Sequence, residues 1–401
     1  MGSEKVRELP AGTAVPGGSR DGARTPVHRL LLARADGVRD LLTGRPVSLY
    51  ATAVLRIGYG LLYLAFLLRE FPHRDEIWGP GSPWTPSLAA QLFDQTGWWS
   101  FLLLSDSRAY FELCYGLALL TSALFLLGWR TRATSLLFAG VVVSFHARAI
   151  FMTDGGDNLL LLMALYLTLT ACGRRWSLDA RRARIKAART DVARTRHVVA
   201  PDLRAARRTL VTVVHNCGVL VIAAQVCFLY GSAGLYKVQG SFWDDGTALH
   251  YVLNLELFQP WPALSHAMDR CPLAMAVAGY LTVLTQVAFP FVLFGRLKYP
   301  VLTVLLGMHV AIAVVLGLPL FSGTMIVADA VFLPDRFYAF LPHLVRRGTR
   351  RCDGPGPERG TGLGSVPQQG GHPDAREEHR PVSRPASGHA GPPPSGSTTA
   401  P

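Results

Sequence analysis

Residues 210–236 read LVTVVHNCGVLVIAAQVCFLYGSAGLY, a long run without a charged side chain. An apolar run of roughly 20 residues is long enough to cross the hydrocarbon core of a bilayer as a helix. In the whole chain of 401 residues, 50% are hydrophobic, only 17% are charged, and the mean hydropathy is +0.25. A soluble domain usually has about a quarter of its residues charged. The composition therefore predicts an integral membrane protein.

Similar apolar runs recur on both sides of this segment. They lie at about Ser48–Leu68, Ala109–Trp129, Thr131–Phe151, Gly156–Cys172, Pro272–Gly295 and Pro300–Leu318. A weaker eighth run begins near Phe321, carries Asp329 and then meets Pro334, so a full span and a re-entrant half-span both remain open. Lipid satisfies no backbone polar group, and these runs are too long and unalternating for barrel strands. The expected fold is all-α, an integral membrane bundle of about eight transmembrane helices.

Basic residues give the expected orientation. The loop 173–209, between the fourth and fifth runs, is rich in arginine and poor in acids. Cytoplasmic loops carry an excess of Lys and Arg, so this loop is expected to be cytoplasmic. Counting spans outward from it places both termini in the cytoplasm and the segment after residue 237 outside. The prediction is a multi-pass protein of the plasma membrane whose first partner is the lipid bilayer.

Three regions follow from this map. Residues 1–47 form a cytoplasmic N-terminal segment, partly disordered, and residues 48–341 form the membrane domain. The tail 342–401 is rich in Gly, Pro and Ser and is expected to be disordered, because it cannot bury enough apolar surface to fold. The net charge of +13 does not come from a basic face on a soluble domain, so no nucleic-acid partner is expected. The six cysteines form no CxxC pair, and no metal site is predicted.

Polar groups inside the apolar runs need a physical reason, because each costs roughly 2.5–3.5 kcal/mol on insertion scales. Arg56, in the first run, either anchors an anion or is satisfied by neighbouring carbonyl groups, and Glu112 is a candidate partner for it. His309, in the seventh run, is either a satisfied core histidine or part of a site. Asp157 and Asn158 fall at a helix start, where such side chains cap free N–H groups. A pocket role for these two residues is a further hypothesis.

The richest polar stretch is residues 230–251, YGSAGLYKVQGSFWDDGTALHY, at the outer end of the fifth run. The small residues at 231–234 allow another helix or a flat ligand to approach closely. Lys237 is either an interfacial lysine with its charge in water or a partly desolvated general base. Tyr236 and Trp243 accompany it as pocket candidates.

The run AGLYKVQGSFWDDGTALHYVL, residues 233–253, resembles the AG-x-x-K…W…G…Y stretch of the vitamin K-dependent γ-carboxylases. Their bacterial relatives, the horizontally transferred transmembrane (HTTM) domain proteins, share it. Weaker matches occur in the family's order: RIGYGLLYL at 56–64, GGDNLLLL at 155–162 and FSGTMIVADAVF at 321–332, after the histidine run. The resemblance covers about Ser48 to Arg336.

The resemblance implies that Lys237 is a base that deprotonates a reduced quinone of the menaquinone or vitamin K type. In the carboxylases the oxygenated quinone then removes a proton from a substrate glutamate, and CO2 adds. Two departures put carboxylation in doubt. Asp157 or Asn158 stands where the carboxylases have a catalytic histidine, and only the tail follows the last span in place of their large outer domain.

Two hypotheses therefore stay open. The first is a quinone-dependent oxygenase or carboxylase-like enzyme in which Lys237 is the base and His309 and Asp157 line its pocket. The second is a non-enzymatic membrane protein that assists the maturation or export of a secreted peptide. A secreted peptide or protein is a possible partner under both hypotheses.

Overall fold

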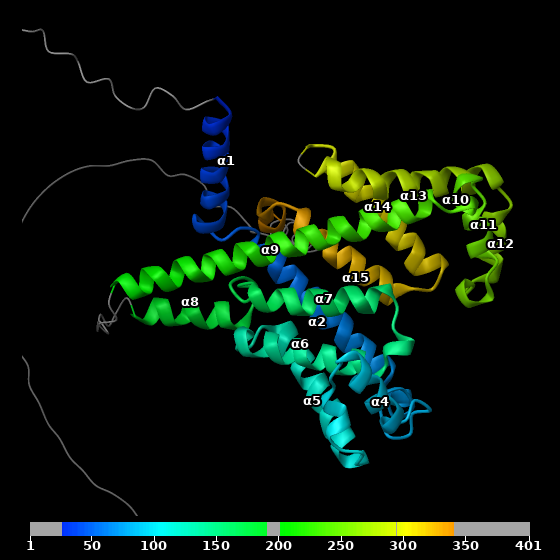
Figure 1. Cartoon of the computed structure of the whole chain (residues 1–401), viewed down its shortest axis with the longest axis horizontal. Coiled ribbons are helices and arrows are strands. Elements are labelled where there is room, and N and C mark those ends of the chain that lie inside the picture. The colour runs from blue at the N-terminus through cyan, green and yellow to red at the C-terminus, as the bar shows by residue number, and fades with distance from the viewer. Residues whose placement is uncertain (1–25, 191–200, 294, 341–401) are drawn as a thin grey trace, which may run out of the picture. The chain divides into compact units, whose positions relative to one another are not determined.

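The computed structural model describes residues 26–190, 201–293 and 295–340, and within these ranges every regular element is a helix (Figure 1). The helices are α1 Pro26–Thr43, α2 Leu49–Arg69, α3 Arg74–Ile77, α4 Pro86–Thr96, α5 Arg108–Leu127, α6 Thr131–Arg148, α7 Gly155–Leu169, α8 Leu178–Thr190, α9 Pro201–Val238, α10 Ser241–Asp244, α11 Ala248–Leu253, α12 Pro262–Asp269, α13 Pro272–Val292, α14 Lys298–Val315 and α15 Pro319–Asp329. The all-α class is confirmed for this part of the chain. The predicted disorder of the first 25 residues and of the tail 342–401 concerns residues outside it.

Five of the described helices are long and apolar enough to cross a membrane, by length and composition. They are α2, α5, α9 from Asp202 onward, α13 and α14. Helix α7 and the segment Pro319–Phe332 are apolar but shorter. The 11 residues of α15 extend only ~16 Å, about half the thickness of a hydrocarbon core. The weak eighth run therefore begins with a helix of half-span length.

Helix α2 lies at the centre of the packing and contacts α5, α7 and α15. Its residues Leu55, Tyr59, Tyr63 and Leu67 recur at every fourth position and are buried. This spacing places them on one face of the helix, against its neighbours. They belong to one core cluster that also takes in buried residues of α5, α6, α7, α9, α13 and α14. The core is thus built around a stripe on α2.

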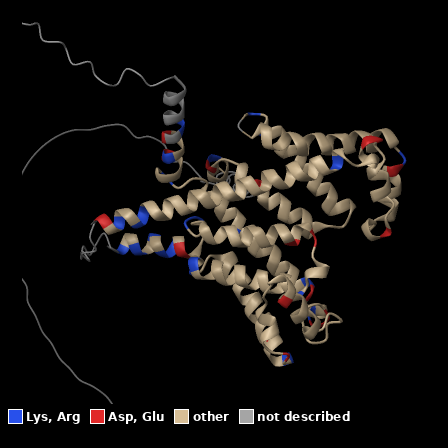
Figure 2. Ribbon diagram, in the orientation of Figure 1, with Lys and Arg blue, Asp and Glu red and all other residues tan. Residues whose placement is uncertain are grey.

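Helix α9 has 38 residues, so it extends about 57 Å and exceeds the ~30 Å of a hydrocarbon core. Lys and Arg gather on α8 and on the N-terminal part of α9 (Figure 2). The arginine-rich loop predicted at 173–209 is therefore largely helical where it is described. The opposite end of α9 carries the predicted Lys237 site.

The small-residue run at that end of α9 lets α13 approach closely. A Cβ atom on Gly234 would lie 2.8 Å from Cγ2 of Val287 and 2.9 Å from its backbone nitrogen. Any larger side chain at this position would push the two helices apart. Of the two predicted occupants, a helix or a flat ligand, the structure shows a helix against Gly234.

Two buried polar residues of α9 hold the link between α1 and α2. Asn216 accepts a hydrogen bond from the backbone N–H of Val47 at 3.0 Å. Its side-chain nitrogen donates to the carbonyl oxygens of Leu41, Leu42 and Arg45. His215 accepts from the N–H of Ala171 through Nδ1 at 3.0 Å, and its Nε2 lies 2.8 Å from the Val47 oxygen. Both side chains are fully buried with their polar atoms paired, which indicates a structural role.

Asp179, near the start of α8, caps the start of α6. Its carboxylate accepts hydrogen bonds from the backbone N–H groups of Arg130 and Thr131, at 3.0 and 2.7 Å, and from the Thr131 hydroxyl at 2.8 Å. Partial burial opposes the charged form of Asp179. The hydrogen bonds from Thr131 and Arg130 outweigh this effect and lower the pKa of Asp179 below its ordinary value. The carboxylate therefore stabilises the fold in its charged form.

This cap predicts a pH-dependent contribution to stability. Because the pKa of Asp179 is lower in the folded state, its contribution should be complete above the unfolded pKa of about 3.9. It should be lost as the pH falls through the folded pKa. We expect Asp179→Asn to lower the midpoint of thermal unfolding at pH 7, and the gap to wild type to close in acid. Asp94→Asn, at an exposed carboxylate of α4, is the control and should cause no such gap. An equal gap at all pH values would contradict the assignment.

Candidate functional site

Lys237 lies in the last turn of α9 with a half-buried side chain. Its Nζ is 3.4 Å from the carbonyl oxygen of Ala233, one turn earlier, and 5.3 Å from the ring centre of Trp243. No ion pair joins Lys237 to a carboxylate of the described residues. Tyr236, in contrast, is 81% exposed and contributes nothing to the same surroundings. The structure thus joins Lys237 with Trp243 and separates it from Tyr236.

A buried polar cluster joins three helices, and its member on α9 is Tyr230, seven residues before Lys237. The hydroxyl of Tyr230 on α9 lies 3.0 Å from Nε2 of His309 on α14 and 3.0 Å from Oδ2 of Asp329 on α15. All three side chains are at least nine-tenths buried. A hydroxyl carries one proton, so if it donates to Asp329 it must accept from His309. This arrangement leaves Nδ1 of His309 as an acceptor.

The cluster ends in two acceptor atoms without partners in the described residues. They are Nδ1 of His309 and Oδ1 of Asp329. Buried polar atoms are normally paired, and an exception indicates a ligand, a water or a functional strain. On the neighbouring α13, Oε1 of Gln286 is also buried without a partner. Gln286 lies beside Gly234, so this third acceptor is close to the end of α9.

Lys237 and the cluster share one face of α9. Tyr230 and Lys237 are seven residues apart, which is two helical turns or about 10.5 Å along the axis. Tyr230 links this face of α9 to His309 on α14 and Asp329 on α15. A common pocket for Lys237 and His309 stays a prediction.

Asp157 and Asn158 lie in the first turn of α7, but neither is the N-cap residue. Asp154 is the N-cap, and its Oδ1 accepts from the N–H groups of Gly156 and Asp157 at 2.6 and 3.0 Å. Asp157 returns the interaction by accepting from the Asp154 N–H at 3.0 Å. Asn158 donates to the Asp154 carbonyl oxygen at 2.9 Å. The expected capping is confirmed for Asp157, which accepts the N–H of Asp154 as the second member of a capping box, whereas Asn158 bonds a carbonyl group and caps no free N–H.

Asp157 also lines two adjoining cavities of about 250 and 180 Å³. The cavities share Phe66, Arg69, Met152, Asp157 and Leu160 in their walls. Neither Lys237 nor His309 lines either cavity. One pocket that holds Asp157 together with Lys237 and His309 therefore stays a prediction.

Arg56 is fully buried and bonded to carbonyl groups. Its Nη1 donates to the Phe125 oxygen at 2.7 Å and to that of Leu126, and its Nη2 and Nε donate to the oxygens of Trp176 and Cys172 at 2.6 and 3.4 Å. Every guanidinium nitrogen thus donates to a carbonyl group, and four of the five N–H groups are engaged. Two interpretations of Arg56 were open, an anion anchor and a buried arginine satisfied by carbonyl groups, and the structure shows the second.

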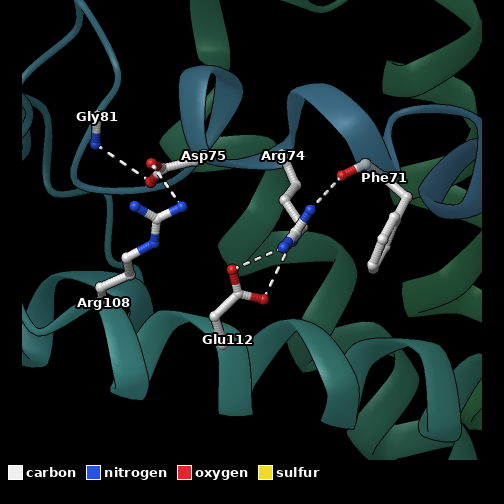
Figure 3. A network of polar contacts seen from close by, with 6 residues as sticks. All are labelled: Phe71, Arg74, Asp75, Gly81, Arg108 and Glu112. Atoms are coloured by element: carbon white, nitrogen blue, oxygen red, sulfur yellow. Dashed lines mark hydrogen bonds and ion pairs between the residues drawn. The ribbon is translucent and has the colours of Figure 1, made fainter.

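The suggested pairing of Arg56 with Glu112 was wrong. Glu112, on α5, accepts two hydrogen bonds from Arg74, at 3.0 and 2.9 Å (Figure 3). Arg74 also donates to the carbonyl oxygen of Phe71 at 2.6 Å, and the neighbouring Asp75 lies 3.7 Å from Arg108. A forked guanidinium–carboxylate pair of this kind fixes both side chains. The network attaches the segment after α2 to the start of α5.

Sequence reasoning missed Tyr230, and it treated Asp329 only as an obstacle to spanning. The spacing of Tyr230 and Lys237 along α9 was the available signal, since seven residues return to the same helix face. The contact with Asp329 joins residues 99 positions apart and has no local signature. No group of three or more His, Cys, Asp or Glu side chains in the described ranges could hold a metal ion.

Comparison of the chain with protein-family models, curated proteins and solved structures gave no match. Functional assignment therefore rests on the geometry of the site and on the resemblance in residues 233–253.

The polar cluster predicts a large effect of a small substitution. Tyr230→Phe removes one hydroxyl and leaves Nε2 of His309 and Oδ2 of Asp329 buried without it. We expect the free energy of unfolding to fall by about 1–3 kcal/mol, the usual range for leaving buried polar groups unpaired. Thermal unfolding of the purified protein in detergent measures the change. Tyr299→Phe is the matched control, because Tyr299 is 47% exposed and should tolerate the loss. Equal unfolding midpoints for the two variants would contradict a paired cluster.

Proposed function

We propose that the chain is a multi-pass membrane enzyme of the HTTM type that uses a reduced quinone, with Lys237 as its general base. One observation carries the proposal: a half-buried lysine without a carboxylate partner among the described residues lies two helical turns beyond Tyr230, in a buried cluster with unpartnered acceptor atoms. A base must release its proton easily, and a carboxylate partner would hold the ammonium form in place. No described carboxylate forms an ion pair with Lys237.

The residues near Lys237 fit a reduced quinone. Its hydroxyl groups need acceptors, and the unpartnered atoms of Gln286 and His309 supply two. Gln286 lies beside Gly234 near the end of α9, and His309 is linked to α9 through Tyr230. Phe289 packs on Tyr230, with ring centres 4.8 Å apart, and adds an apolar wall. When bound, the quinone would supply the electrons for reaction with oxygen. Lys237 would take the proton from a hydroxyl group of the quinone. His309 would either take that proton in turn or hold the hydroxyl group in position.

The carboxylase-like part of the proposal has less support than the quinone part. The match to the carboxylases' catalytic histidine falls on Asp157 or Asn158, and the side chains of both are engaged with Asp154 at the start of α7. We therefore propose quinone-dependent oxygenation as the core activity. Attack of the product on a peptide substrate would be an additional step.

We also propose that eight segments cross the plasma membrane with both termini in the cytoplasm. The five apolar helices, together with α6, α7 and the segment from Pro319 to residue 340, give that number. Helix α15 is too short alone, but residues 335–340 continue as helix after a 3-10 turn at Ala330–Phe332. The arginines of α8 and of the start of α9 support a cytoplasmic position for that end.

Fusion reporters test this topology. Fluorescent-protein fusions after residue 196 and after residue 401 should fluoresce, because this reporter matures in the cytoplasm. A phosphatase fusion after residue 259, in the link between α11 and α12, should be active, because this enzyme folds only outside. If a phosphatase fused after residue 401 were active and the fluorescent protein fused there were dark, the C-terminus would lie outside the cell. This result would contradict eight spans and make the segment after Pro319 re-entrant.

Substitution of Lys237 tests the activity. The assay follows loss of reduced menaquinone with purified full-length protein and oxygen, against protein-free micelles. Lys237→Ala and Lys237→Arg should both lower the rate by about 100-fold or more, since general-base catalysis contributes 10²–10⁴ and a guanidinium stays protonated. Lys298→Ala is the matched control, because Lys298 lies over Tyr299 at the same 5.3 Å that separates Lys237 from Trp243.

Two results would contradict the proposal. Full activity of Lys237→Arg would make Lys237 an interfacial anchor. No quinone consumption by the wild-type protein would favour the alternative role, a membrane partner in maturation or export of a secreted peptide.

A further inference from the structure

The larger cavity that Asp157 lines has an aromatic wall. Its volume is about 250 Å³, and Tyr63, Phe66, Trp78 and Phe145 line it. Their rings contact one another in sequence, with centre distances of 6.0 Å from Tyr63 to Phe66, 5.6 Å from Phe66 to Trp78 and 5.5 Å from Trp78 to Phe145. The indole nitrogen of Trp78 donates to the Phe145 carbonyl at 3.1 Å, which fixes the ring. This wall is therefore rigid and already formed.

One buried polar side chain in the cavity lining has no hydrogen-bond partner among the described residues. The hydroxyl of Tyr63 is unpaired although Tyr63 is only 5% exposed. Buried hydroxyl groups are almost always paired in proteins. A tyrosine hydroxyl can donate or accept, so a ligand with one hydroxyl can satisfy it. His146 also lines the cavity, with its ring tilted against Trp98.

The charged groups of the lining are already engaged. Arg69 pairs with Glu70 at 2.5 Å, and the Arg69 side chain is 57% exposed. Asp157 is held by the N–H of Asp154 in the cap of α7. An ionic ligand would therefore compete with these contacts. The Tyr63 hydroxyl, which has no partner among the described residues, suits an uncharged ligand.

The volume sets the size of this ligand. An apolar cavity of about 150 Å³ in another protein stays dry and binds benzene. The present cavity is larger and adds the unpaired Tyr63 hydroxyl to an aromatic wall. We propose that it binds a small uncharged aromatic molecule that carries a phenolic hydroxyl, with the hydroxyl paired to Tyr63. This site goes beyond the proposed function, because Lys237 and His309 do not line it.

Binding of fluorinated probes tests the site without enzymatic turnover. A negative result in this experiment is therefore distinguishable from a negative result in the quinone assay. Purified full-length protein in detergent is titrated with 4-fluorophenol and followed by fluorine NMR, with empty micelles subtracted. We expect a saturable shift for 4-fluorophenol and at least fivefold weaker binding of 4-fluorotoluene, which replaces the hydroxyl by a methyl group. Tyr63→Phe should weaken 4-fluorophenol binding by about fivefold, the usual effect of one lost hydrogen bond.

The matched control is Tyr115→Phe. Tyr115 belongs to the same aromatic cluster, 6.0 Å from Trp78 between ring centres, but it does not line the cavity and its hydroxyl donates to the Leu67 carbonyl. This variant should bind 4-fluorophenol like the wild type. Ala149→Leu enlarges a residue of the cavity wall and should abolish binding of both probes.

Three results would overturn the proposal. Equal binding of 4-fluorotoluene would show an apolar void without hydroxyl recognition. Tighter binding of 4-fluorobenzylamine would show that Glu70 and Asp157 make a cation site instead. A shift that does not saturate would mean that the cavity holds only water.

Discussion

The hydrogen bonds from Arg56 to the last carbonyl groups of α5 hold together the end of the bundle where α5 finishes. The last carbonyl groups of a helix have no partner within it, and Gly128 ends α5 in a left-handed conformation at φ 68°. A Cβ atom on Gly128 would lie 2.8 Å from Nη1 of Arg56, so glycine is needed for space as well as for backbone geometry. The cation also complements the negative end of the helix dipole. One side chain thereby joins α2, α5 and the segment that follows α7.

The requirement that buried polar groups be paired also explains other contacts at the same end of the bundle. Asn216 satisfies three carbonyl oxygens and one N–H of the link between α1 and α2. Asp179 supplies the start of α6 with the acceptors that its own sequence lacks. Elsewhere in the described bundle the rule is broken, because His309, Asp329 and Tyr63 keep unpaired polar atoms. Unpaired buried groups carry a free-energy cost, which favours a functional explanation for them.

Apolar length was enough to predict the helical class and the positions of the long helices, because burial of the backbone in lipid depends on length and composition alone. It could not predict partners. Arg56 bonds to carbonyl groups and not to Glu112 because of where α5 ends in space. The cluster around Tyr230 forms because α14 and α15 approach α9 there. The half-length of α15 was left open, since Asp329 and Pro334 allow a span or a re-entrant piece. Asp154 was overlooked as the cap because Asp157 also suits a helix start.

The contacts of Asp157 limit what the resemblance to the carboxylases supports. A motif match transfers a role only if the surrounding helices place the matched residues together. Lys237 lies two helical turns from Tyr230, whose hydroxyl contacts His309 and Asp329. The Asp157 carboxylate stabilises a helix start and borders a cavity that neither Lys237 nor His309 lines. The proposed base chemistry at Lys237 and the proposed ligand binding beside Asp157 therefore use different residues of one bundle, so a substitution can remove one of them and leave the other.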